Sequence, residues 1–274
     1  MLIFNRKKRV IFLICSYLYV VIATILYAKT EYGSLASVPK EASGLNFFYG
    51  TQGSFSSALL FFFYISVMPF LYSHNIISAK NNHFDNLMIT RLGSQKRYRL
   101  KAIVMNIVYS GGIFLSYRIL ELVVSVMIIN PINFTEETRS LFDQLPYVFS
   151  TNSILNLVFY LILSTIGAIV FASFILSIGL FLKNSVLYYA VGLIASLFFS
   201  LVPGLLMGLL NIRSFIGSLF MNSVSFDTLF TPGIRTLGSY APKFNAWVPF
   251  AGSVFFFGLV TFILYKVWDQ YYDE

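Results

Sequence analysis

Two residues of opposite charge stand three positions apart inside a long apolar run. The run reads "SYRILELVVSV", and the two residues are Arg118 and Glu121. Residues three apart share one face of a helix, so this spacing favours an ion pair. A lone charge near the middle of a bilayer costs roughly 2.5 kcal/mol or more. We therefore expect the two to pair as a structural link between helices, or to line a wet path or a subunit interface.

A second polar stretch, residues 81–102, combines an apolar stripe with a dense group of cations. Gly93 is suited to end one helix, and Ser94 to cap a second helix that leads into the next apolar run. We expect a short amphipathic helix, a break and a basic stalk. This unit either lies on anionic headgroups or fills a groove on a partner protein. The stripe recurs at the spacing of one helix face, at Phe84, Leu87, Met88 and Leu92.

The sequence lacks the common motifs for phosphate binding, for metal coordination and for disulfide formation. There is no G-x-x-x-x-G-K-[ST] loop to cradle phosphates. His74 and His83 stand at or beyond the end of an apolar run, where we expect interfacial side chains and not metal ligands. A single cysteine, Cys15, cannot build a disulfide framework. We therefore expect no enzyme and no cofactor in this chain.

The composition is that of an integral membrane protein. Hydrophobic residues make up 57% of the 274 residues and charged residues only 11%, against about 25% in soluble domains. Runs this long and apolar must be helices, because lipid offers no partners to an open backbone. We predict one all-α polytopic domain, residues 1–274, with six spans at about 10–28, 58–76, 102–129, 154–182, 186–210 and 248–265.

Lys and Arg fix the expected orientation. With the N-terminus inside, twelve of the 19 cations fall in inner segments and six in outer ones, and Arg118 lies within a span. The positive-inside rule then places both termini in the cytoplasm. The net charge of +8 is interpreted as this topology signal and not as a nucleic-acid site. The first run follows "NRKKR" as a signal peptide would, but its length and the lack of a clean cleavage site favour an uncleaved span.

The connections between the spans differ in kind. Pro69 predicts a kink in the second span, and Pro203 with Gly204 predicts an interruption of the fifth. The turn "KNS" between the fourth and fifth spans is minimal. The long outer segment 211–247 has apolar patches, so we expect short helices at or in the outer leaflet. We expect another short helix over residues 133–146.

This architecture resembles the membrane subunit of ABC transporters of the type-2 exporter class. The segment "NNHFDNLMITRLGS" is similar to that family's coupling helix, and "FLKNS" to its second inner contact. The outer segment between the fifth and sixth spans is similar to its re-entrant helices. One departure is that "MLIFNRKKR" is too short for the family's full N-terminal elbow helix. The loose R-x-G-S-x-K-x-Y-like run that shares in the resemblance comprises Arg91, Gly93, Ser94, Lys96 and Tyr98.

The resemblance implies a partner-driven transport subunit. ATP and Mg would be bound by separate cytoplasmic ABC ATPase subunits, and a second, identical or homologous permease would complete the path in a bacterial plasma membrane. Lys183 and Asn184 would form a smaller ATPase contact. The coupling residues implied on the helix before the break are Phe84, Asp85, Leu87, Met88, Arg91 and Leu92.

The function we predict from the sequence is export of an amphipathic peptide or a hydrophobic compound, with membrane lipid around the bundle and no nucleic acid partner. Two alternatives come from other classes of protein. One is a stand-alone membrane scaffold or immunity protein, and the other is an ion-coupled carrier without an ATPase.

Overall fold

The computed structural model describes residues 6–34, 43–53, 58–81, 84–129, 149–150, 152–212, 214–234 and 247–273. Within these ranges the regular elements are helices and none is a strand, which confirms the all-α expectation. The helices are α1 (Arg6–Tyr32), α2 (Gly44–Gly53), α3 (Ala58–Ser66), α4 (Phe70–Asn81), α5 (Phe84–Leu92), α6 (Gln95–Ile128), α8 (Ser153–Gly179), α9 (Ser185–Leu209), α10 (Phe215–Val224), α11 (Asp227–Phe230) and α12 (Trp247–Asp273).

Five helices among the described residues are long and apolar enough to cross a membrane, namely α1, α6, α8, α9 and α12. They coincide with five of the six expected spans and confirm a multi-pass membrane protein in that coarse sense. Three of them exceed the expected bounds by several residues, and α1, expected over residues 10–28, spans Arg6–Tyr32. The helix α6 already begins at Gln95, and α12 continues to Asp273, because a helix does not stop where its apolar run stops.

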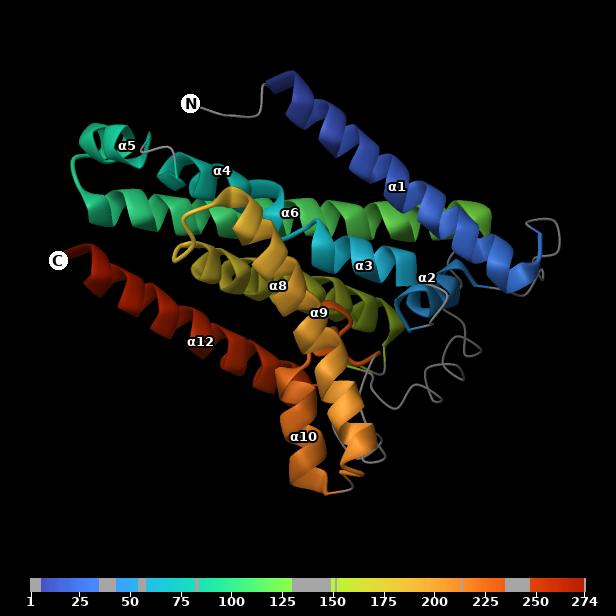
Figure 1. Cartoon of the computed structure of the whole chain (residues 1–274). Coiled ribbons are helices and arrows are strands. Elements are labelled where there is room, and N and C mark those ends of the chain that lie inside the picture. The colour runs from blue at the N-terminus through green and yellow to red at the C-terminus, as the bar shows by residue number, and fades with distance from the viewer. Residues whose placement is uncertain are drawn as a thin grey trace.

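The expected second span, residues 58–76, is divided. Residues 67–69 form a turn between α3 and α4, and Pro69 has no N–H with which to continue the first helix. The Val67 amide still bonds the Phe63 carbonyl at 2.9 Å, and the Phe70 amide bonds the Val67 carbonyl at 3.2 Å. Figure 1 shows α3 and α4 following each other alongside α6. Neither helix alone has the roughly 20 residues that a crossing needs.

The expected interruption of the fifth span does not occur. The helix α9 runs unbroken from Ser185 to Leu209 with Pro203 inside it. A proline leaves the carbonyl four residues earlier without its helical partner, and here that carbonyl belongs to Phe199. The Phe226 amide, just before α11, donates to it at 3.2 Å. A contact from a neighbouring segment thus replaces the missing bond, as buried backbone in a membrane protein requires.

Short helices follow α9, as the apolar patches of segment 211–247 predict. The helix α10 packs against α9 and α12, and α11 packs against α8 and α12 (Figure 1). The α11 region is the centre of an aromatic core. The rings of Phe171 and Phe226 are 4.3 Å apart, those of Phe226 and Phe257 are 4.5 Å apart, and those of Phe171 and Phe230 are 4.9 Å apart. The expected helix at 133–146 lies outside the described residues.

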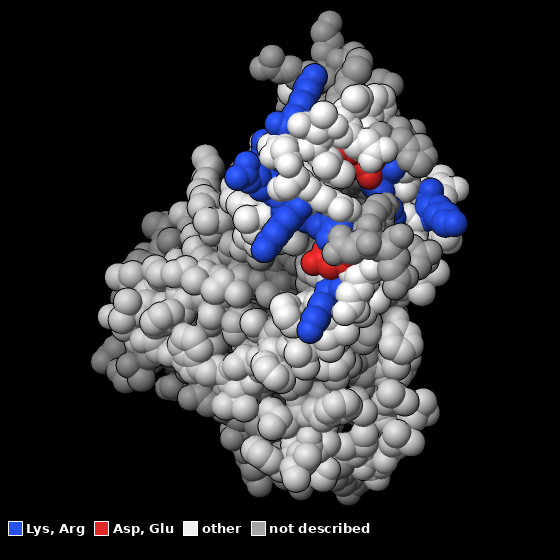
Figure 2. Space-filling view, turned by 90° about the vertical axis from the view of Figure 1, so that its left-hand side faces the viewer, with Lys and Arg blue, Asp and Glu red and all other residues white. Residues whose placement is uncertain are grey.

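One end of the bundle carries most of the described cations, and we name it the basic end. It holds α5, the first turns of α6, the α8–α9 turn (residues 180–184) and the last turns of α12 (Figure 1). The first turn of α1 points toward the same end. Figure 2 shows Lys and Arg gathered on this face. Its exposed cations are Arg91, Lys96, Arg97, Lys101, Lys183 and Lys266.

The packing of α11 against α8 yields a test. A Cβ at Gly167 of α8 would overlap the main-chain atoms of Leu229 in α11. Because main chain cannot move aside as a flexible side chain can, Gly167→Ala should lower the free energy of unfolding by about 2 kcal/mol. Thermal unfolding of the purified protein in detergent measures this. Gly112→Ala on α6, where a Cβ meets nothing within 4 Å, is the control and should be neutral or stabilising. Equal midpoints for the two variants would contradict this packing.

Candidate functional site

Arg118 and Glu121 form the ion pair that their spacing predicts. Arg118 Nη1 lies 3.0 Å from Glu121 Oε2, and the side chains are only 1% and 0% exposed. Both lie on α6, one turn apart. The pair is therefore sealed among helices and does not face solvent in this conformation.

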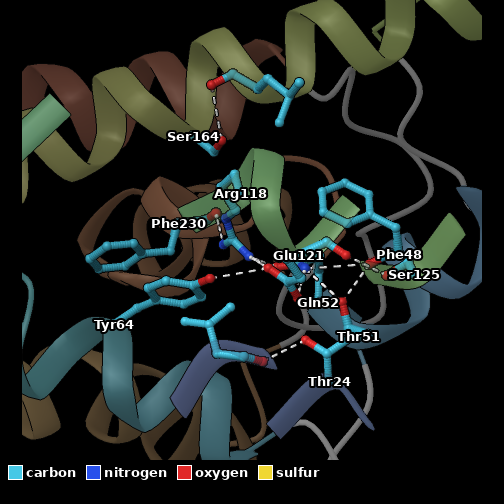
Figure 3. Close-up of polar contacts among 12 residues, drawn as sticks. Thr24, Phe48, Thr51, Gln52, Tyr64, Arg118, Glu121, Ser125, Ser164 and Phe230 are labelled. Atoms are coloured by element: carbon cyan, nitrogen blue, oxygen red, sulfur yellow. Dashed lines mark hydrogen bonds and ion pairs between the residues drawn. The ribbon is translucent and has the colours of Figure 1, made fainter. Parts of the chain in front are cut away.

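The Glu121 carboxylate is held by donors from two other helices (Figure 3). From α2, Thr51 Oγ1 and Gln52 Nε2 each donate to Glu121 Oε1 at 2.6 Å. From α3, the Tyr64 hydroxyl donates to Glu121 Oε2 at 3.1 Å. These neighbours and the arginine together supply hydrogen-bond donors to both oxygens of the buried carboxylate.

The Arg118 guanidinium reaches a further helix. Its Nη1 donates to Gln52 Oε1, and its Nη2 donates to the Phe230 carbonyl of α11 at 3.1 Å. Its Cζ lies 4.4 Å from the centre of the Tyr64 ring and 4.9 Å from that of Phe114. Such cation–π contacts contribute most when water is excluded.

The buried pair thus connects α6 to α2, α3 and α11. This arrangement supports the interpretation of a structural link between helices, which was one of the two left open by the sequence. Thr51, Gln52 and Tyr64 were not singled out from the sequence. A signal existed for the first two, because "TQ" directly follows the mostly apolar stretch "LNFFYG", residues 45–50.

The break between α5 and α6 is as predicted. Gly93 has a φ of 74°, a left-handed conformation that favours glycine, and it ends α5. Ser94 is the N-cap of α6, and its side chain accepts from the Arg97 amide at 3.2 Å. The basic stalk is therefore the first part of one continuous helix that reaches Ile128.

The two faces of α5 differ. Leu87 is 60% exposed and Arg91 is exposed, whereas Phe84, Met88 and Leu92 are half-buried. Asp85, which the family resemblance includes in the docking set, is only 9% exposed. With Ile89 it lines a cavity of about 30 Å³ between α5 and the bundle. The outward face therefore centres on Leu87, and Asp85 faces inward.

The end of α4 is bonded to the α8–α9 turn. Lys80 Nζ donates to the Leu180 carbonyl and, at 3.2 Å, to the Leu182 carbonyl, which are groups that the end of α8 leaves unpaired. Burial lowers the pKa of the Lys80 ammonium, and the nearby Asp85 carboxylate opposes that shift. Asn81 Nδ2 lies 3.4 Å from Ser185 Oγ at the start of α9.

The turn itself presents the second pair of expected contact residues. Lys183 and Asn184 are both exposed. Asn184 is the N-cap of α9, and its Oδ1 accepts from the Val186 amide at 2.8 Å. Asn184 thus has a local structural role in addition to its exposure. Through Lys80, this turn and the helix that precedes α5 form one bonded unit.

The last turns of α12 are fixed to the same unit. Arg99 of α6 forms an ion pair with Asp269 of α12, and the Cζ atom of Arg99 lies 4.6 Å from the centre of the Trp268 ring.

The histidine of α4, His74, contacts the Tyr189 hydroxyl of α9 through Nδ1, and the centres of the two stacked rings are 5.7 Å apart. No cluster of three His, Cys, Asp or Glu side chains occurs within the described ranges.

The buried pair gives a stability prediction. Glu121→Ala leaves Arg118 buried without its counter-charge, so it should cost about 3–5 kcal/mol of unfolding free energy. The double variant Arg118→Leu/Glu121→Leu removes both charges and should lose less, although Thr51 and Gln52 then lack their acceptor. Chemical unfolding in detergent and the level of protein in the membrane compare the variants.

Asp269→Asn is the matched control, because it breaks a half-exposed ion pair that is worth about 1 kcal/mol or less. A double variant that is less stable than Glu121→Ala would contradict the structural role. Equal loss of transport in the single and double variants, at normal membrane levels, would assign the pair to a transport path.

Comparison with known proteins gives no family for the chain. No protein-family model matches it, and neither a curated protein nor a solved structure is significantly similar to it. The function of the chain is therefore inferred from the geometry of the buried pair and the basic end.

Proposed function

We propose that this chain is the membrane-spanning permease subunit of an ATP-driven ABC exporter in a bacterial plasma membrane. In this proposal the basic end faces the cytoplasm. ATP and Mg are bound by separate ATPase subunits, and a second permease completes the path. The cargo we propose is an amphipathic peptide or a hydrophobic compound.

The single observation that carries the proposal is the setting of α5. This nine-residue helix packs on α4 and α6 at the basic end and turns Leu87 outward. An exposed leucine beside Arg91 on a short, fixed helix suits the groove-filling mode of partner recognition. A helix whose only role is to lie on lipid headgroups does not require Asp85 to be buried between α5 and the bundle.

The bonds at the basic end support a mechanical role. A force on α5 acts directly on α4 and α6, between which it lies. Lys80 passes movement of α4 to the α8–α9 turn, and the Arg99–Asp269 pair passes movement of α6 to α12. Packed bundles of this kind switch between discrete arrangements and do not deform continuously. An ATPase that grips α5 would thus move several membrane helices together.

The proposal takes α3 and α4 as a sixth crossing with a break at Pro69. Together they extend from residue 58 to residue 81, and at about 1.5 Å per residue this length suffices for a hydrocarbon layer of about 30 Å. Broken helices are tolerated in membranes where neighbouring helices cover the break. The turn at 67–69 lies beside α6 in Figure 1.

An ATPase should co-purify with the unmodified chain, and Leu87→Asp should break that complex. A carboxylate in an apolar groove has no partner there, so recovery of the ATPase should fall at least tenfold. Affinity purification from membranes of the native host, with mass spectrometry of the bound proteins, measures the recovery.

Val267→Asp is the matched control, because it places the same charge on an exposed position of α12 at the basic end. It should leave the complex intact. If no ATPase accompanies the unmodified chain, a scaffold or an ion-coupled carrier takes the place of this proposal. Transport that stops when the ion gradient is collapsed at full ATP would identify the carrier.

Lys80→Met should separate binding from coupling. It keeps α5 and its outward face but removes the bonds from α4 to the Leu180 and Leu182 carbonyls. We expect normal recovery of the ATPase and a several-fold drop in cargo moved per ATP hydrolysed in proteoliposomes. Lys96→Met, on an exposed cation of the stalk, should keep the unmodified ratio. An unchanged ratio for Lys80→Met would refute the proposed link.

A further inference from the structure

A groove lies on the side of the bundle where α1 diverges from α4 and α6. Figure 1 shows α1 leaving its neighbours toward its first turn. The groove has a volume of about 560 Å³ and is bounded by α1, the α3–α4 region, α6 and α9. Small-molecule sites fall at about 300–1,000 Å³, so this volume is that of a ligand site and not of a packing defect.

The polarity of the groove changes along its length. Phe12, His74, Asn75 and Tyr189 line it within about 5 Å of the ends of their expected spans, at 1.5 Å per residue. By the same count, Val67 and Ile113 lie roughly 15 Å from the ends of their expected spans, which is half of a hydrocarbon layer of about 30 Å. In the expected topology the groove would extend from one membrane surface to the midplane, with the polar groups of His74, Asn75 and Tyr189 at its mouth. Its deep end is apolar apart from Ser66, whose hydroxyl bonds the Phe62 carbonyl of its own helix.

The sequence is rich in cations next to the helix segments that form the mouth of the groove. The residues Arg6, Lys7, Lys8 and Arg9 form the first turn of α1, directly before the groove residues Phe12 and Leu13. The exposed cations of α6, which also lines the groove, lie at the same end of the bundle. Each cation near a membrane surface contributes about 1 kcal/mol toward an anionic lipid.

We propose that this groove binds one anionic glycerophospholipid of the leaflet at the basic end. One acyl chain lies between α1 and α4 and ends near Ile113, and the phosphate lies at the first turn of α1. Moving a chain from the bilayer into an apolar groove gains little, because both surroundings are apolar. The selection of this lipid therefore comes from its headgroup charge.

The dimensions favour a lipid chain over a helix of a second copy. A helix with its side chains is about 10–12 Å wide and needs a groove of that width along its whole length. An acyl chain is far thinner and fits a groove that narrows between two diverging helices. This inference requires only that the basic end lies at a membrane surface, and it does not depend on an ATPase.

Photolabelling tests the proposal with the full chain in nanodiscs of phosphatidylcholine. The probe is phosphatidylglycerol with a diazirine in mid-chain, and the comparison probe is phosphatidylcholine with the same chain. We expect at least fivefold more labelling by the anionic probe, on the groove-lining peptides of α1, α3–α4 and α6. Equal labelling by the two probes would overturn the proposal, as would label spread evenly over all lipid-facing helices or a crosslink that joins the groove to a second copy.

Variants locate the two parts of the site. Ile113→Trp fills the deep end and should reduce groove labelling at least fivefold, whereas Ile119→Trp, on the exposed face of the same helix, should not. Replacing Lys7, Lys8 and Arg9 together by Gln should reduce the preference for the anionic probe to less than twofold, whereas Lys266→Gln should keep it. If Ile113→Trp fails to fold, the preference ratio of the unmodified chain still decides the outcome. Retained labelling in a folded Ile113→Trp variant would contradict the proposed position of the chain.

Discussion

The buried ion pair on α6 constrains the packing of this bundle more than any apolar contact does. An arginine and a glutamate withdrawn from water cost several kcal/mol each unless their hydrogen-bonding groups are met. Here Thr51, Gln52, Tyr64 and the Phe230 carbonyl bond the two side chains, and among the described residues only Arg118 Nε of the pair lacks a partner. Apolar helices in lipid have little preference among apolar neighbours, because lipid chains are as apolar as leucine. The need of the buried Arg118 and Glu121 side chains for hydrogen-bond partners therefore favours the packing of α2, α3 and α11 against this part of α6.

A second set of polar contacts joins the helices at the basic end. Lys80 bonds α4 to the end of α8, and Arg99 bonds α6 to α12. The helix α1 is not joined by the Lys80 and Arg99 contacts, and its first turns diverge from the bundle. Further along, Ser16 and Tyr17 bond the side chains of Tyr117 and Ser116 on α6. The protein thus has a cross-bonded body that carries α5, and one helix whose first turns stand away from that body. The proposed lipid groove lies where these two parts separate.

Sequence patterns predicted the features that arise from local physics. Apolar length gave five of the spans, and the preferences of glycine and serine gave the break between α5 and α6. The spacing of Arg118 and Glu121 predicted their pairing.

The features that could not be predicted from the sequence depend on contacts between distant segments. Pro203 stays inside α9 only because the Phe226 amide reaches the Phe199 carbonyl. Gln52 is essential to the buried pair, but nothing local in "GLNFFYGTQG" shows which helix it will meet. Asp85 faces inward because α5 packs on the bundle, which its apolar stripe alone does not reveal.

The proposed function requires that the outward face of α5 is the surface that an ATPase holds in the cytoplasm. The most direct measurement is the accessibility of a cysteine at position 87, in a chain whose exposed Cys15 is replaced by serine. A membrane-impermeant maleimide should label this cysteine in inside-out vesicles after the ATPase has been stripped. The maleimide should not label this cysteine in inside-out vesicles while the ATPase is bound, nor in intact cells. Labelling from outside intact cells, or equal labelling with and without the ATPase, would contradict the account.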